Sequence, residues 1–219
     1  MNVFTNYAQY YDLLNQQKDY IKEVDYIISL IDKYTPGTKN ILDLGSGTEL
    51  HAIHLAKQGY NIHGVDQSQD MVSIANERLN SGSDLKELLK FTVGDIRNIQ
   101  IDQIFDTVVS LFHVMNYQTT NEDLQNSIKT AYNHLDSNGF FIFDCWYGPA
   151  VIADKPYKRT KTYENKNLVI NRTAIPTMYP SKNMVDVNFD ITITKKSTGK
   201  SERISELHKI RCDIYLSWK

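Results

Sequence analysis

The chain has 219 residues, with 24 lysines and arginines against 26 aspartates and glutamates, a length that suits one sizeable α/β domain with a small appended subdomain. The near balance of charge provides no bulk positive field, so we expect no nucleic-acid partner and leave only a local basic patch open. No apolar run approaches the roughly 20 residues that cross a bilayer, and residues 1–14 lack a basic segment followed by an apolar one, so we expect a cytoplasmic protein with no membrane partner.

The first part of the chain predicts a helix, a buried strand, a glycine turn and a second helix. Residues 18–34 carry apolar side chains at spacings of three and four, which form one helical face, and Pro36 follows as a helix-ending signal. Residues 41–44 are apolar apart from one acid and predict the end of a parallel strand. After the turn, residues 49–58 predict a helix that Gly59 closes.

The next segment predicts a second strand, a helix and a short third strand. Residues 60–65 form the expected second strand, with Asp66 at its end. Ser68 is a favourable N-cap for a helix that carries apolar residues on one side. Residues 91–94 predict the third strand.

Two more strands and a helix complete the pattern. Residues 105–111 predict a fourth strand, and the helix after it is expected to pack through an inner face made of Leu124, Ile128, Ala131 and Leu135. We expect Gly139 to stop this helix. Residues 140–146 predict a fifth strand, buried between helices on both faces because it is almost continuously apolar. The alternation therefore predicts an α/β fold with a doubly wound parallel sheet.

Beyond Pro149 the chain predicts strands without helices. Residues 184–194 alternate strictly between apolar and polar side chains, a period of two that is typical of a strand. Residues 168–174 and 204–210 predict neighbouring strands of a small antiparallel sheet. We therefore expect two domains, 1–149 with the helix at 18–34 included, and 150–219 as a β lid or cap that extends from the end of the fifth strand.

The glycine turn ILDLGSGTEL decides which kind of cofactor the first domain accepts. Gly45 and Gly47 let the backbone turn tightly and approach a ligand closely, because neither carries a Cβ. The dinucleotide fingerprint needs a third glycine three residues after the second. Leu50 occupies that position, which argues against a nicotinamide or flavin enzyme.

Three acids suit a different ligand. Asp43 precedes the first glycine by two residues, Asp66 ends the second strand, and Asp95 follows the third. This set fits a molecule with a ribose, an adenine and a positive centre but no phosphate. S-adenosylmethionine has those groups.

Residues 41–146 resemble the class I S-adenosylmethionine-dependent methyltransferases. The matching residues follow the first three strands and are Asp43, Gly45, Gly47 and Thr48, then Asp66, Ser68, Asp70 and Met71, then Gly94, Asp95 and Arg97. The resemblance implies a Rossmann-like sheet, S-adenosylmethionine as cofactor and S-adenosylhomocysteine as its product.

The resemblance also implies a role for each cofactor-binding residue. Asp66 would accept both ribose hydroxyls, and a hydrogen bond to a charged group contributes about 1.5–3 kcal/mol. Asp95 would take the adenine amino group, with Met71 and Ile96 on either side of the ring. Two alternatives stay open: Asp66 caps the following helix, and Met71 belongs to the core. The full candidate set is Tyr11, Tyr20, Asp43, Gly45, Ser46, Gly47, His51, Asp66, Gln67, Met71, Asp95, Ile96 and Leu111.

A narrower group of residues is similar to the N-methyltransferases that act on nucleotide-linked amino sugars, with glycine N-methyltransferase as a more distant relative. These residues are Tyr11-Asp12, Lys18-Asp19-Tyr20, His51, His54, Ser110, Phe112 and Trp146. In such enzymes a β-sheet insertion after strand five covers the acceptor site. The resemblance further implies that Tyr11 and Tyr20 close over the methionine end of the cofactor.

Two features depart from the family pattern. Glu49 stands where a third glycine is usual, and a positive φ there costs a residue with a Cβ on the order of 1–2 kcal/mol, so we expect reduced cofactor affinity. The last residues, CDIYLSWK, are too short for the helix and strand pair that normally complete a seven-stranded sheet. Strand five would then be an apolar edge, to be covered by the C-terminal segment, by a partner subunit in a homodimer, or by more chain in a longer protein.

Methyl transfer mainly requires alignment of the acceptor and a free lone pair on it. His113 follows the fourth strand, and its ordinary pKa near 6.5 suits a base at neutral pH, although a structural histidine under the lid is an equal alternative. Tyr11 is the second catalytic candidate. Further acceptor-side candidates are Asn116, Tyr117, Trp146 and Tyr147.

We expect no metal site. His51 and His54 lie three residues apart without a fitting third ligand, and Cys145 and Cys212 lack metal-ligand spacing, which predicts unpaired thiols. The chain also lacks the Asn/Asp-Pro-Pro-aromatic segment with which amino-methylating enzymes act on nucleic acids.

The sequence thus predicts an S-adenosylmethionine-dependent methyltransferase for a small-molecule acceptor, with an amino sugar or related amine as the expected substrate. The alternative is an inactive or truncated relative that only binds S-adenosylmethionine or S-adenosylhomocysteine. Glu49 and the short C-terminus keep that alternative open.

Overall fold

The computed structural model describes residues 8–81 and 84–212, and they divide into two compact units. The parallel-sheet unit comprises Lys18–Met115 and Thr120–Asp144. The antiparallel-sheet unit comprises residues 8–17, Asn116–Thr119 and residues 145–212. The domain boundaries at 149 and 150 stay a prediction.

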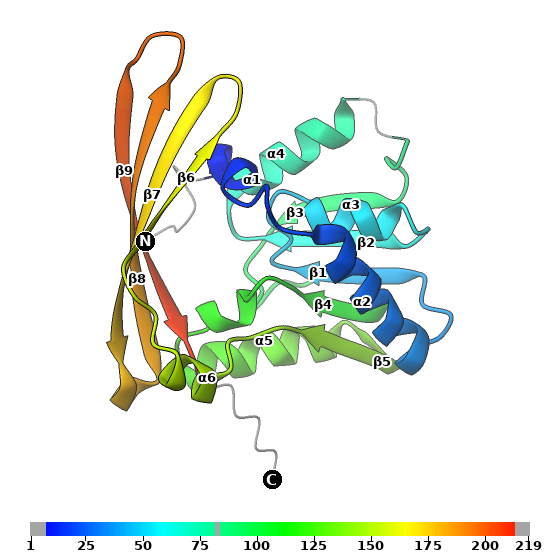
Figure 1. The fold of residues 1–219 in the computed structure, drawn as a ribbon. Coiled ribbons are helices and arrows are strands. Elements are labelled where there is room, and N and C mark those ends of the chain that lie inside the picture. The colour runs from blue at the N-terminus through cyan, green and yellow to red at the C-terminus, as the bar shows by residue number, and fades with distance from the viewer. Residues whose placement is uncertain (1–7, 82–83, 213–219) are drawn as a thin grey trace. The chain divides into compact units, whose positions relative to one another are not determined.

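The parallel-sheet unit contains the predicted five strands in the order β3-β2-β1-β4-β5, and every adjacent pair is parallel (Figure 1). This order reverses direction at β1, so the connections wind both ways from the centre. The strands are β1 (Asn40–Leu44), β2 (Asn61–Asp66), β3 (Leu89–Val93), β4 (Phe105–Ser110) and β5 (Leu135–Phe143). The doubly wound sheet expected from the sequence is therefore confirmed.

Four helices belong to this unit; α2 precedes β1 and the other three connect strands, and three of the four begin at a side-chain cap. Asp19, Ser68 and Thr120 each accept the backbone N–H three residues on, which satisfies one of the open donors of a helix start. Ser68 is the predicted cap. The helices are α2 (Tyr20–Tyr34), α3 (Leu50–Ala56), α4 (Gln69–Asn80) and α5 (Asn121–Asn133).

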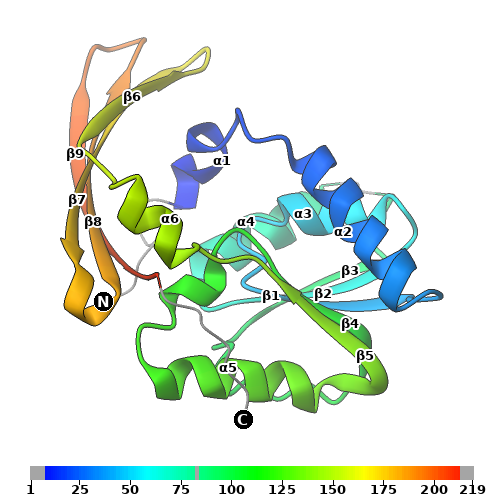
Figure 2. The same cartoon turned by 60° about the horizontal axis from the view of Figure 1, so that its bottom comes forward.

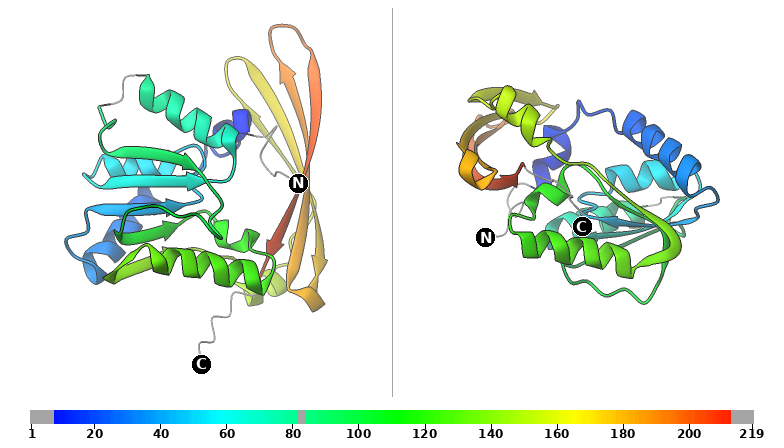
Figure 3. Two further views of the ribbon diagram at one scale, coloured as in Figure 1. Left: turned by 180° about the vertical axis from the view of Figure 1, so that it is seen from behind. Right: turned by 90° about the horizontal axis from the view of Figure 1, so that it is seen from below.

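The core of this unit lies between the sheet and α2, α3 and α4. Helix residues such as Ile31, Leu55 and Val72 share one buried cluster with Ile41 and Val109 of the central strands. Figures 2 and 3 show α2 and α3 on one face of the sheet and α5 on the other. Helices therefore lie on both faces of the parallel sheet.

The predicted end of the fourth helix and the start of the fifth strand were wrong. Leu135 and Gly139 belong to β5, where Leu135 pairs with Phe105 and the register then shifts before Phe140 pairs with Thr107. A Cβ on Gly139 would lie 2.9 Å from the carbonyl oxygen of Asp106. Gly139 thus allows β4 and β5 to lie close together where their register is irregular. The pattern of apolar residues that predicted a helix contains no sign of this contact.

The predicted burial of strand five was also wrong. No residue of β5 is fully buried, and Phe140 is 41% exposed. Among the described residues β5 is one of the two edge strands of its sheet, and the Phe140 ring stacks on Tyr34 of α2 at 5.3 Å. The C-terminal segment, one of the candidates expected to cover this edge, follows Cys212 and lies outside the described residues.

The antiparallel-sheet unit contains four strands in the order β6-β7-β8-β9. The alternating segment predicted at 184–194 is β8, and the two predicted neighbours pair with it. The sheet also has a strand that the sequence did not indicate, because β6 carries mostly charged and polar residues. The strands are β6 (Arg159–Glu164), β7 (Leu168–Tyr179), β8 (Met184–Lys195) and β9 (Ser201–Arg211).

Short helices complete the described chain and also went unpredicted. They are η1 (Ala8–Tyr10), α1 (Tyr11–Leu14), η2 (Val114–Tyr117), α6 (Gly148–Ala153) and η3 (Pro180–Lys182). Tyr10 and Leu14 pack on an apolar face of the antiparallel sheet that includes Ile170 and Ile191. Helices of one or two turns leave too little periodicity for recognition in a sequence.

Both cysteines are free thiols, as predicted. In the part of the chain that is described, no helix is long and apolar enough to cross a membrane.

Candidate functional site

The turn after β1 has the backbone that its glycines require. Gly45 and Gly47 have φ of +90° and +56°, and the N–H groups of Gly45 and Ser46 both donate to the carbonyl of Val65. A Cβ on Gly45 would lie 2.5 Å from the side chain of Val114, whereas no described atom lies within 4 Å of that position at Gly47. The turn is therefore closed on one side and open to a ligand at Gly47.

Asp66 fastens this turn to the end of β2. Its Oδ2 accepts the N–H of Gly47 at 2.9 Å and its Oδ1 accepts the N–H of Ser68 at 2.8 Å. Each carboxylate oxygen has about two acceptor positions, so each retains capacity for a ligand hydroxyl. Burial raises the pKa of Asp66, while the two backbone N–H groups act to lower it.

Asp43 lies beside this carboxylate at the end of β1. Its side chain is buried, and burial together with the negative charge of Asp66 raises the pKa of Asp43 to about 7. Two acids held together away from water are costly, and a cationic ligand would relieve that cost. The arrangement favours a ligand that carries positive charge and hydroxyl groups.

The predicted Glu49 strain is present. Glu49 has φ of +83°, a region that favours glycine, and its buried side chain lies 3.9 Å from Nη1 of Arg78. Arg78 also donates to the carbonyl of Thr48 at 3.2 Å. Arg78 of α4 thus balances the negative charge of Glu49, although it lies 29 residues further along the chain.

Ser46 and Gln67, two other predicted contacts, differ in exposure. Oγ of Ser46 is buried without a hydrogen-bond partner in the described residues and lies 2.7 Å from the position of a Cβ on Gly64. Ser46 therefore faces β2. Gln67 is exposed.

The residues predicted around adenine are divided between core and surface. Met71 and Ile96 are 2% and 7% exposed, so they also form part of the packed interior. Asp95 receives the guanidinium of Arg97 through Nε at 2.9 Å, and Arg97 reaches Asp123 at 2.9 Å as well. The hydrogen bond from Arg97 lowers the pKa of Asp95, which keeps this carboxyl ionised.

A second charged cluster joins α2 to α3. Oε2 of Glu23 lies 2.8 Å from both Nζ of Lys18 and Nε2 of His51, and the ring of Tyr20 meets His51 edge-on at 4.9 Å. Burial acts to raise the pKa of Glu23, but the hydrogen bonds from His51 and Lys18 lower it to about 2. Burial lowers the pKa of His51, against the effect of Glu23.

The structure brings the predicted Tyr20 and His51 together through this cluster. Glu23, which organises it, was not predicted. The only local signal is that Glu23 lies on a helix five residues after Lys18, and its contact with His51 spans 28 residues.

His113 lies in a strained segment after β4. Phe112 and His113 both have φ of +64°, and Nζ of Lys18 lies 3.4 Å from the centroid of the Phe112 ring. The backbone N–H of His113 donates to Oδ1 of Asp144 at 2.9 Å, and Nδ1 of His113 lies 3.2 Å from Oδ2. Leu111, before them, is buried. Asp144 was not predicted, and no local pattern links it to His113.

The remaining acceptor-side candidates belong to the antiparallel-sheet unit. Asn116 donates to the carbonyl of Arg211 and accepts the N–H of Trp146 at 3.0 Å. The hydroxyl of Tyr117 lies 2.8 Å from Nδ1 of His208, a residue that was not predicted. Tyr11 belongs to this unit as well and packs on its apolar face, so its role at the cofactor stays a prediction.

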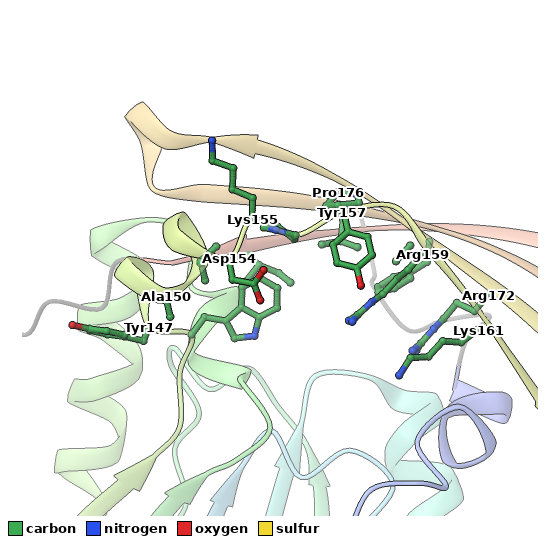
Figure 4. Close-up of a pocket in the computed structure, with 16 residues that line it drawn as sticks. Tyr147, Ala150, Asp154, Lys155, Tyr157, Arg159, Lys161, Arg172 and Pro176 are labelled. Atoms are coloured by element: carbon green, nitrogen blue, oxygen red, sulfur yellow. The ribbon is translucent and has the colours of Figure 1, made fainter.

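The antiparallel-sheet unit contains a cavity of about 480 Å³ between α6, the loop after it and the sheet (Figure 4). Trp146, Tyr147, Tyr157 and Phe189 are its aromatic lining residues. The cations Lys155, Arg159, Lys161 and Arg172 line it too, against the single acid Asp154.

These cations are placed by strand pairing. Lys161 of the edge strand β6 lies directly opposite Arg172 of the interior strand β7, and Arg159 lies two pairs along, on the same face. Figure 4 shows the charged ends of Arg159, Lys161 and Arg172 extending from the sheet in one direction. Like charges in opposite positions destabilise a strand pair, so an anion bound there would relieve the repulsion.

No group of three or more histidine, cysteine or acidic side chains within the described residues could hold a metal ion.

Residues 41–139 match the methyltransferase-domain family. The chain is 30% identical over 151 residues to the dTDP-3-amino-3,4,6-trideoxy-alpha-D-glucopyranose N,N-dimethyltransferase of Streptomyces venezuelae, a match that covers 68% of this chain and 61% of that protein. It is 26% identical over 154 residues to the glycine/sarcosine N-methyltransferase of Aphanothece halophytica, covering 69% and 56%. The chain thus spans less than two thirds of the length of these two relatives.

Two solved structures have the same fold. DesVI of Streptomyces venezuelae aligns with a TM-score of 0.81 and 25% identity over 94% of this chain and 83% of that chain. The sugar N-methyltransferase KedS8 from Streptoalloteichus aligns with a TM-score of 0.79 and 18% identity over 92% and 77%. The second similarity concerns the fold alone.

Proposed function

Because this chain belongs to the class I S-adenosylmethionine-dependent methyltransferases and is related to the amino-sugar N-methyltransferases, we propose that it methylates the amine of a small molecule. The observation that carries the proposal is the pair of acids Asp43 and Asp66 at the open glycine turn. The cofactor supplies a methyl group on a sulfonium, which its positive charge already activates for displacement.

The residues at the turn fit this cofactor. Asp66 retains acceptor positions for ribose hydroxyls beside the bonds from Gly47 and Ser68. Space above Gly47 admits a ligand close to the backbone. Asp43 provides a negative charge for the sulfonium and ammonium groups, and binding of a cation would favour its ionised form.

The proposed acceptor is a nucleotide-linked amino sugar. The cationic cavity supports this, because Lys161 and Arg172 suit phosphate oxygens and the aromatic lining suits a nucleobase. An alternative explanation needs no ligand: cations on an edge strand discourage pairing with the sheet of another molecule, which would account for Arg159 and Lys161. That explanation does not extend to Arg172, because it lies on an interior strand, against the rings of Tyr163 and Phe189.

Within this proposal the predicted domain 150–219, which includes the antiparallel sheet β6 to β9, is the acceptor-binding lid. His113 is the candidate base for the acceptor ammonium, and Tyr11 and Tyr20 are candidate contacts of the cofactor. Burial lowers the pKa of His113, with Asp144 acting against this, which favours a neutral imidazole that keeps a lone pair for the proton.

Two measurements test the proposal. Calorimetry is expected to detect S-adenosylmethionine binding, and methyl transfer assays with nucleotide-linked amino sugars, glycine and simple amines are expected to give turnover with the first class. Binding of the cofactor without turnover on any amine would favour the alternative of an inactive relative. Absence of binding would refute both.

The cavity is tested by Lys161→Gln, which we expect to raise KM for a nucleotide-linked amino sugar about tenfold while KM for S-adenosylmethionine stays unchanged. Lys209→Gln is the matched control, because Lys209 is an exposed lysine of β9 on the other face of the sheet. Equal effects of the two substitutions would show that the cavity does not bind the acceptor.

A further inference from the structure

We propose that Asp144 is a positioning residue that holds the backbone and the ring of His113 in one orientation. The inference rests on the proposed function, because it matters for catalysis only if His113 acts as the base. Nothing in the motifs of the sequence pointed to Asp144.

The first observation is a double contact by one carboxylate. Oδ1 of Asp144 accepts the backbone N–H of His113 at 2.9 Å, and Oδ2 lies 3.2 Å from Nδ1 of the same residue. One carboxylate oxygen thus accepts a hydrogen bond from the backbone of His113, and the other lies against its ring as a charge contact, without hydrogen-bond geometry. A carboxylate placed only for solubility has no need of this geometry.

The second observation is how the fold brings the two residues together. Ser110 at the end of β4 pairs with Phe143 at the end of β5, and the N–H of Asp144 donates to the carbonyl of Ser110 at 3.4 Å. Because carboxyl ends of parallel strands meet at one edge of a sheet, the residues after β4 and β5 become neighbours. This edge also carries the glycine turn after β1.

The third observation is backbone strain in the segment that carries the base. Phe112 and His113 both have φ of +64°, which L residues rarely adopt and which persists only where surrounding contacts enforce it. Asp144 holds the N–H of His113, and Lys18 lies over the Phe112 ring. Val114 leaves no room for a Cβ at Gly45. The segment is therefore fixed from three sides.

Electrostatics then select a tautomer. A carboxylate beside Nδ1 favours the proton on that nitrogen, which leaves the lone pair on Nε2. The charged groups that act on His113 are Asp144 and Glu23, which raise its pKa, and Lys18, which lowers it together with burial. Asp144 is the charged group in contact with the ring.

The test uses ¹⁵N-histidine NMR of the full chain, with His113→Gln to assign the signal. We expect Nδ1 of His113 to be protonated in the parent. In Asp144→Asn the amide can donate to Nδ1, so we expect the proton to move to Nε2. The same variant is expected to lose kcat by about 100-fold or more, the range of general base catalysis, with KM for S-adenosylmethionine unchanged. Asp144→Glu should restore the parent tautomer and part of kcat.

Asp102→Asn is the control, because Asp102 is an exposed acid elsewhere in the same unit. A parent protein with Nε2 protonated, or an Asp144→Asn variant with the parent tautomer and kcat, would overturn the inference. If Asp144→Asn does not fold, the parent spectrum and Asp144→Glu still decide it. The spectra need neither cofactor nor acceptor, so a failure of the proposed function, seen as no turnover by the parent, is distinguished from a failure of this inference.

Discussion

The backbone N–H of Gly47 donates to Oδ2 of Asp66, so the turn after β1 and the end of β2 form one rigid corner. Asp66 therefore has two roles that its substitution must separate. One is structural: Asp66 fixes the turn through Gly47 and also accepts the N–H of Ser68, the N-cap residue of α4. The other is to bind the ribose.

Asp66→Asn retains a carbonyl oxygen for the backbone but loses the charge. We expect S-adenosylmethionine affinity to fall about tenfold or more, since a hydrogen bond to a charged group contributes about 1.5–3 kcal/mol. Calorimetry measures the affinity, and urea unfolding checks that the turn stays folded. Asp102→Asn, at an exposed position outside the motifs, is the control and should bind as the parent does.

Asp43 should make the free protein less stable at high pH. Its folded-state pKa of about 7 lies above the unfolded value of about 3.9. The contribution of Asp43 to the free energy of unfolding is therefore fully present below about pH 4 and is lost as pH rises through about 7. Asp43→Asn should remove this loss, on the order of a few kcal/mol, as measured by urea unfolding at pH 5 and pH 8. The same variant should bind S-adenosylmethionine more weakly at pH 8. A variant with the pH dependence of the parent would contradict the assignment.

His63 should have the opposite effect. Its ring is buried against Phe105 and lies 2.8 Å from the hydroxyl of Thr92, and burial lowers its pKa to about 4. The unfolded chain takes up a proton below about pH 6.5 that the folded chain refuses, so stability falls as pH drops from about 6.5 to about 4, by up to about 3 kcal/mol.

His63→Gln cannot titrate and should flatten this part of the pH profile in urea unfolding. His54→Gln is the comparison, since His54 is only partly buried on α3; burial lowers its pKa as well, so its removal should flatten the profile less than His63→Gln does. Because Asp43 and His63 act in opposite directions between pH 4 and 6.5, the two variants must be measured separately. Equal slopes in His63→Gln and the parent would exclude the prediction.

Glu49→Gly should raise affinity for S-adenosylmethionine. Glycine removes a left-handed strain on the order of 1–2 kcal/mol at φ of +83° and also removes the carboxylate near the proposed cofactor. Glu49→Ala removes the carboxylate but retains the Cβ, so it separates the two effects. Calorimetry on the parent and the two variants measures the affinity. If Glu49→Gly binds S-adenosylmethionine no more tightly than the parent, Glu49 does not weaken cofactor binding.

Several features followed from the sequence because their causes are local. The turn at Gly45 and Gly47, the cap at Ser68 and the alternation of β8 each depend on residues a few positions apart. These features could therefore be predicted from the sequence alone. The doubly wound sheet and the acids at its edge could be predicted with them.

Other features depend on register between distant segments. Gly139 was predicted to stop a helix because of its residue type, but it lies in β5, where a Cβ would clash at the shifted register against β4. Strand β6 was missed since its exposed cations give no apolar alternation. The pairing of Lys161 with Arg172 exists only once β6 and β7 are aligned.

The sequence by itself determined the family resemblance, the two kinds of sheet and the acids around the glycine turn. Only the tertiary structure decided which charges meet: Arg78 at Glu49, Glu23 between Lys18 and His51, and Asp144 at His113. The physical reason is range. Periodicity and turn chemistry act over a few residues, whereas each of these side-chain contacts, apart from the one between Lys18 and Glu23, requires separate elements to be packed first.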